Sequence, residues 1–99
     1  MKKIFKVNLT RQAQEDLDQV VSYISANNPG NAGKFIGELE EKILSLATFP
    51  ERAGLIPENQ FLGTGYRHLL HERYRVIYRR EDDTVFVLRV IHGAKLLEL

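Results

Sequence analysis

The chain has no cysteine and no long apolar run, and its basic and acidic residues nearly cancel. Without cysteine there is neither a disulfide framework nor a thiolate metal site. No window approaches the roughly 18 consecutive apolar residues of a membrane span. The N-terminus alternates polar with apolar residues, which is not typical of a signal peptide. A formal net charge of +1 excludes a broadly cationic polymer binder. These absences predict a cytoplasmic protein without a membrane segment.

The length and composition favour a single small domain. The 99 residues, of which 43% are hydrophobic, predict one compact domain over residues 1–99. A chain this short buries only a modest fraction of its surface, so we expect a small core and a stability that is marginal or assisted by a partner.

The first half of the chain predicts a strand followed by two helices. Apolar residues among lysines over residues 4–9 indicate the strand, and Thr10 offers an N-cap hydroxyl to an amphipathic helix over about residues 11–26. Pro29 and Gly30 end this helix, and a second apolar stripe from residue 32 to residue 47 indicates another helix that stops before Pro50. The short connection predicts an antiparallel helical hairpin.

The second half predicts a loop and three strands. Residues 50–65 hold two prolines and three glycines without periodicity, and we expect an ordered surface loop whose apolar residues contact the domain, namely Leu55, Ile56, Phe61 and Leu62. Strands follow over about residues 66–71, 73–80 and 84–92, with a tight turn at Asp82 and Asp83. The resulting order β-α-α-β-β-β predicts an α+β fold, with the helical hairpin packed on one face of a small, mainly antiparallel sheet.

Arginines are concentrated in the last predicted hairpin. If Asp82 and Asp83 form a two-residue turn, one side of the sheet carries Arg73, Arg75, Arg79 and His92. One more residue in the turn would bring Arg89 to that side in place of His92. Guanidinium groups bind phosphate and carboxylate equally well. We expect a cationic face opposite the helices, although solvent-facing polar positions remain the alternative.

Other polar and apolar side chains leave alternatives open. His92 stands where the last strand ends, and it is either a general acid or base or a cap that hydrogen-bonds the backbone. His68 and His71 are three residues apart on one strand, so they point to opposite faces, and no metal site is predicted. No glycine-rich phosphate loop occurs, and no cofactor is predicted. Three leucines near the end either pack back on the domain or await a partner: Leu96, Leu97 and Leu99.

Four segments together resemble the ParE/RelE superfamily of bacterial toxins from type II toxin–antitoxin systems. They are the "DL" of the first helix, "ATFPERAG" after the second, "YRVIYR" and "VLRVIHGAK", within a similarity that runs over about residues 7–95. The resemblance implies the same β-α-α-β-β-β fold. It also implies neutralisation in a hetero-oligomer by a cognate antitoxin with an acidic, disordered C-terminal segment.

The resemblance implies two different activities. RelE-like members cleave mRNA on the ribosome, and in such a ribonuclease the candidate catalytic residues here would be Arg75, His92 and Tyr78. ParE-like members poison DNA gyrase without chemistry of their own. The lysine-rich surface of RelE-like proteins and their tyrosine after the last strand are missing here, since "GAKLLEL" contains no tyrosine. The sequence therefore favours a ParE-like, non-enzymatic toxin, and a non-toxic antitoxin-binding scaffold or co-repressor is a further alternative. The residues predicted to bind antitoxin or target are Arg67, Arg73, Arg75, Arg79, Arg89 and Lys95.

Overall fold

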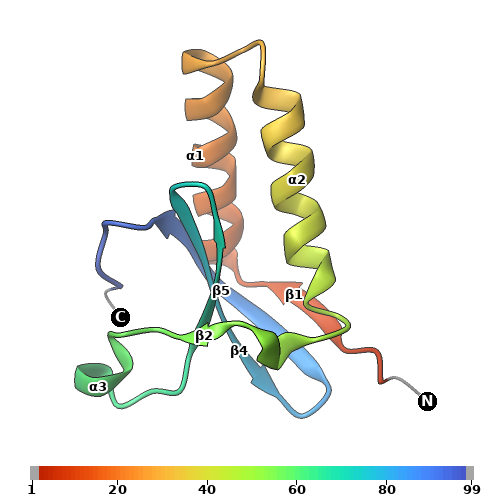
Figure 1. Ribbon diagram of the computed structural model, residues 1–99, viewed down its shortest axis with the longest axis vertical. Helices are drawn as coiled ribbons and strands as arrows, with labels where there is room; N and C mark the ends of the chain where they lie inside the picture. The colour runs from red at the N-terminus through yellow and green to blue at the C-terminus, as the bar shows by residue number, and fades with distance from the viewer. Residues whose placement is uncertain (1–2, 98–99) are drawn as a thin grey trace.

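The computed structural model describes residues 3–97 and contains a helical hairpin on a five-stranded sheet. The elements are β1 (Lys6–Leu9), α1 (Arg11–Asn27), α2 (Ala32–Ser45), a 3-10 turn η1 (Pro50–Arg52), β2 (Gly54–Leu55), α3 (Asn59–Leu62), β3 (Arg67–His71), β4 (Tyr74–Glu81) and β5 (Thr84–His92). The strand order is β1-β5-β4-β3-β2, with β1 parallel to β5 and every other neighbouring pair antiparallel. Figure 1 shows α1 and α2 rising together from the sheet. The predicted α+β architecture is confirmed.

Thr10 connects the first strand to the first helix as the sequence predicts. Its Oγ1 accepts a hydrogen bond from the Ala13 amide at 3.1 Å, which satisfies one of the unpaired N–H groups of the first turn of α1. The same hydroxyl donates to the Leu88 carbonyl of β5 at 3.1 Å. One side chain therefore both begins α1 and fixes its position over the sheet.

The sheet separates two apolar clusters. The larger lies between the helices and the sheet, where α1 and α2 contribute buried residues such as Val20 and Leu39, and β4 contributes Val76 and Tyr78. The smaller lies on the opposite face, where Ile77 alternates with these β4 residues. Members of this second cluster are Ile56, Ile77, Ile91 and Leu97, with Leu62 and Tyr66 packed against them.

The segment of residues 50–65 contains more structure than its sequence suggests. It forms η1, β2 and α3, and the Asn59 side chain organises its end. The Asn59 amide group accepts from the Tyr66 amide and the Thr64 hydroxyl and donates to the Tyr66 carbonyl. Of the four apolar residues expected to contact the domain, Ile56 is buried and Leu62 is half-buried, whereas Leu55 and Phe61 remain exposed.

The β4–β5 register differs from the predicted one beyond the middle of the hairpin. The pairs from Glu81↔Thr84 to Tyr78↔Val87 follow the two-residue turn, but a β-bulge then leaves Leu88 without a partner across the ladder. Past this bulge the pairing shifts by one residue, so Arg75 lies opposite Ile91, and Tyr74 lies opposite His92. The prediction of a single register along the whole hairpin was therefore wrong. The register of a two-residue turn holds up to the bulge, and beyond the bulge the pairing is shifted by one residue.

No helix within residues 3–97 is long and apolar enough to cross a membrane.

Candidate functional site

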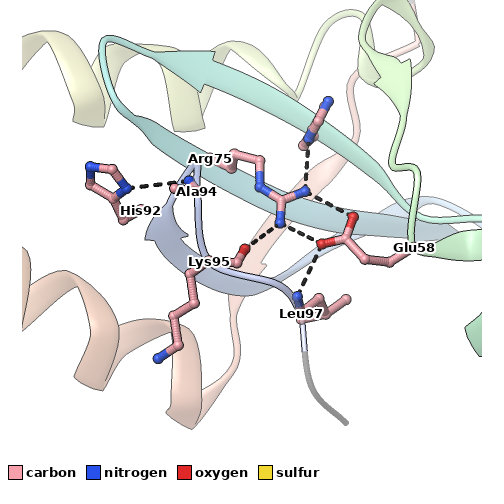
Figure 2. A network of polar contacts seen from close by, with 7 residues as sticks. Glu58, Arg75, His92, Ala94, Lys95 and Leu97 are labelled. Carbon is pink, nitrogen blue, oxygen red and sulfur yellow. Dashed lines mark hydrogen bonds and ion pairs between the residues drawn. The ribbon is translucent and has the colours of Figure 1, made fainter.

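Arg75 lies at the centre of the face opposite the helices, where it forms a buried ion pair. Its side chain is 5% exposed, and that of Glu58, from the segment before α3, is 1% exposed. The guanidinium donates from Nη1 to Glu58 Oε1 at 3.1 Å and from Nη2 to Oε2 at 2.5 Å. Figure 2 shows the two groups facing each other in this forked arrangement. The charge of Arg75 is therefore neutralised within the chain.

The C-terminal tail, which we define as residues 93–97, covers this pair. Arg75 Nη2 also donates to the Lys95 carbonyl at 2.8 Å, and the Leu97 amide donates to Glu58 Oε2 at 3.0 Å. The Leu97 side chain is 2% exposed and joins the second apolar cluster, whereas Leu96 is 65% exposed. Of the two alternatives for the terminal leucines, Leu97 packs back on the domain, and Leu99 lies outside the described residues.

The contacts around Arg75 set the ionisation of its neighbours. The hydrogen bonds from Arg75 lower the pKa of Glu58 from 4.5 to about 2, against the opposing effect of burial. Burial, followed by the charge of Arg75, lowers the pKa of His68. The Nδ1 atom of His68 lies 3.4 Å from Arg75 Nη1, where a neutral imidazole accepts a hydrogen bond. This arrangement stabilises an ionised Glu58 and a neutral His68.

Arg89 forms a second ion pair, on the helix side of the molecule. Its Nε and Nη2 atoms lie 2.6 Å and 3.2 Å from the two carboxylate oxygens of Asp16 in α1. Asp16 is 5% exposed and also accepts from the Val90 amide at 3.0 Å. Burial raises the pKa of Asp16, but the hydrogen bonds from Arg89, Val90 and Gln12 outweigh it, and the pKa lies below its ordinary value. The Asp16 carboxylate therefore connects α1 to Arg89 and Val90 of β5, just beyond the bulge at Leu88.

Replacing Asp16 by asparagine is expected to lower the free energy of unfolding by about 1–3 kcal/mol, because a hydrogen-bonded buried charge is lost while the volume is kept. Chemical denaturation measures this change. The matched control is Asp18→Asn, on an exposed position of the same helix, where the effect should stay within about 0.5 kcal/mol. Equal effects of the two substitutions would show that the Asp16–Arg89 pair does not stabilise the fold.

The predicted open cationic face is not present, because internal partners engage Arg75, Arg79 and Arg89, and Arg73 lies exposed in the turn before β4. Arg75 and Arg89 are paired as described, on opposite sides of the sheet. Arg79 pairs with Glu81 and its guanidinium lies 4.6 Å from the Phe86 ring centroid, while Arg67 donates to the Ala53 carbonyl at 2.6 Å. The loop and the tail also cover the centre of the face, which periodicity along the strands did not indicate. Any binding role of these arginines stays a prediction.

The candidate catalytic side chains do not meet at one open site. Tyr78 is 1% exposed in the helix-side core and donates to the Pro50 carbonyl, and burial raises the pKa of its hydroxyl. His92 is exposed, and its Nδ1 accepts from the Ala94 amide at 3.3 Å, which is the capping contact. Arg75 points to the opposite side from Tyr78, because their positions on β4 differ by an odd number of residues.

A cleft of about 560 Å³ lies between the tip of the helical hairpin and the sheet. The Tyr74 and His92 rings pack edge to face in it, with centroids 5.7 Å apart, and Arg73 and Tyr23 are exposed at its rim. The cleft is lined by one basic residue, Arg73, and one acidic residue, Glu72. Its aromatic floor beside Arg73 suits a peptide segment that carries an apolar side chain next to a carboxylate. Within residues 3–97, no three His, Asp or Glu side chains gather where they would hold a metal ion.

Sequence patterns missed Glu58 and Asp16. Glu58 stands in a segment without periodicity, and no sequence pattern there distinguishes it from the neighbouring polar residues Asn59 and Gln60. Asp16 falls on the inward side of α1, between the buried Ala13 and Val20. A carboxylate on an apolar helical stripe is the signal that could have indicated a buried ion pair.

The known proteins to which the chain is similar come from toxin–antitoxin systems. Residues 7–97 match the family described as ParE toxin of type II toxin–antitoxin system, parDE. A chain of the chromosomal ParDE system from P. aeruginosa has a TM-score of 0.72 and 22% identity, covering 91% of this chain and 97% of that one. A chain of the RelBE2 toxin–antitoxin complex from Mycobacterium tuberculosis has a TM-score of 0.65 and 25% identity, covering 93% and 94%. No curated protein gives a significant match.

Proposed function

Because the chain belongs to the ParE toxin family of type II toxin–antitoxin systems, we propose that it inhibits growth by binding DNA gyrase and that a cognate antitoxin neutralises it. The observation that carries this proposal over a ribonuclease is the state of Arg75. Its guanidinium is buried and its charge is neutralised by the forked pair with Glu58, so it presents no free charge to an RNA phosphate. The separation of Arg75, Tyr78 and His92 supports the same conclusion, since acid–base cleavage needs its groups around one reacting phosphate.

The cleft beside the helical hairpin supports an antitoxin as the partner. Its exposed Arg73 suits a carboxylate, and the Tyr74 and Phe35 rings suit an apolar anchor. A disordered acidic segment that orders on binding would contribute both kinds of side chain. Lys95, exposed on the tail close to His92, adds a further cationic group at this side of the molecule.

Inducing the chain without antitoxin tests the proposal, with DNA and protein synthesis pulse-labelled in parallel. We expect DNA synthesis to stop first and the purified chain to inhibit supercoiling by gyrase while leaving mRNA intact. Co-expression of the antitoxin should abolish both effects. An early arrest of protein synthesis with codon-positioned mRNA cuts would contradict the proposal and identify a ribosome-dependent ribonuclease. Normal growth with antitoxin binding intact would identify a non-toxic binding scaffold.

A further inference from the structure

The tail is bound mainly through its backbone. After β5, the Lys95 amide donates to the His92 carbonyl and the Gly93 amide donates to the Arg73 carbonyl at 2.6 Å, which turns the chain back across the sheet. A β-carbon at Gly93 would lie 3.2 Å from the Arg73 carbonyl oxygen, so the close approach of the two backbones favours a glycine here. Figure 2 shows the following residues running past the Arg75–Glu58 pair.

The Arg75–Glu58 pair holds two backbone groups of the tail that are two residues apart. Arg75 donates to the carbonyl of Lys95, and Glu58 accepts from the amide of Leu97. The Leu97 side chain then fills the apolar cluster beside Ile77 and Ile91. A donor, an acceptor and one apolar pocket together recognise an extended peptide, since backbone hydrogen bonds give affinity and the pocket selects a side chain.

The tail does not use all of the hydrogen-bonding capacity of this site. Among the residues that the structure describes, none accepts a hydrogen bond from the buried Nε of Arg75. A buried donor without an acceptor is unfavourable, and such groups are uncommon in folded proteins. A segment that offered Nε one more carbonyl or carboxylate oxygen would therefore fit the site better than the tail does.

Exposed apolar side chains also lie next to the second cluster in the sequence. Leu55 of β2 and Phe61 of α3 are more than half exposed, and they directly precede Ile56, which belongs to the cluster, and Leu62, which packs against it. Both remain in place when the tail leaves. Exposed apolar side chains beside a buried polar centre are what a protein segment would cover on binding.

We propose that the face formed by Arg75, Glu58 and the second apolar cluster is a peptide-binding site, and that the tail occupies it in the free chain. Its partner is an extended protein segment with an aliphatic anchor in place of Leu97 and an additional oxygen acceptor for Arg75 Nε. Binding of this segment displaces the tail. The site is separate from the cleft beside the helical hairpin, and the proposal does not depend on which enzyme the toxin inhibits.

A synthetic peptide with the sequence AKLLEL, that of residues 94–99, is the probe. The full-length Leu97→Ser variant releases its own anchor, and we expect it to bind the fluorescein-labelled peptide at least about tenfold more tightly than the wild-type chain. The reason is that the wild-type tail competes at a high effective concentration, on the order of millimolar. Leu96→Ser, on the exposed neighbour, is the matched control and should bind as the wild type does. A peptide with serine at the anchor position should not bind.

Hydrogen exchange on the wild-type chain keeps the test decisive if Leu97→Ser does not fold. Saturating peptide should accelerate exchange of the Leu97 amide, because the displaced tail no longer donates to Glu58. Unchanged exchange at saturation, or equal peptide affinity for wild type and folded Leu97→Ser, would overturn the proposal. A concentration-dependent dimer that exchanges tails between copies would also overturn it, because the partner would then be a second copy of this chain.

Discussion

Replacing Glu58 by alanine is expected to lower the free energy of unfolding by about 3–5 kcal/mol, because it leaves the Arg75 guanidinium buried without its counter-charge. The same substitution removes the acceptor of the Leu97 amide and so loosens the tail. Small domains unfold with about 5–15 kcal/mol in total, so this loss is a large fraction of the stability. Urea denaturation of the purified chain measures it.

The surface pair Arg80–Glu51 provides the control for this prediction. Its side chains are 43% and 53% exposed, so Glu51→Ala should cost no more than about 1 kcal/mol although the two charged atoms are 2.5 Å apart. A second chain, Glu58→Ala with Arg75→Met, should recover part of the loss, because no charge then remains buried. If Glu58→Ala and Glu51→Ala cost the same, or if the double variant is the less stable one, the ion pair does not hold this face together.

The sequence alone was enough to predict the helices α1 and α2, the strands β1, β3, β4 and β5, and the packing of the two helices on one face of the sheet. These features depend on local signals that repeat: the apolar stripe of α1, the Thr10 cap, and Pro29 and Pro50 at the helix limits. Each signal acts within a few residues, and the structure confirms the expected elements in their order, with η1, β2 and α3 added between α2 and β3. Arg73 and His92 were both predicted as binding or catalytic candidates, but on the face opposite the helices; the structure places Arg73 in the turn before β4 and His92 at the end of β5, and both line the cleft beside the helical hairpin.

The environment of Arg75 could not be derived in this way. Its partner Glu58 is 17 residues away in a segment without periodicity, and its cover comes from Lys95 and Leu97 at the other end of the chain. No glycine stands at the bulge around Leu88, so nothing in the sequence indicated a bulge there and the register of β5 could not be predicted either. A strand pattern predicts which face a side chain occupies, but not whether another segment covers that face. The predicted open cationic surface was wrong for this reason.

Acidification is expected to destabilise the chain between about pH 4.5 and pH 2, through protonation of Glu58. In the folded chain the pKa of Glu58 is lowered from 4.5 to about 2, so the folded state favours the ionised form. The stabilisation is therefore complete above the unfolded pKa and is lost as the pH falls through the folded one. Because one pKa unit corresponds to about 1.4 kcal/mol, this carboxylate contributes about 3 kcal/mol at neutral pH.

Comparison with Glu58→Gln isolates this contribution from that of Asp16, whose lowered pKa acts in the same direction. Urea denaturation across the acid range should show the wild type about 3 kcal/mol more stable than the variant at pH 7, with the difference shrinking as the pH falls towards 2. Exchange of the Leu97 amide should accelerate over the same range in the wild type, because protonation weakens the carboxylate as an acceptor. A stability difference that stays constant with pH would mean that Glu58 stabilises the tail by its shape and hydrogen bonds rather than by its charge.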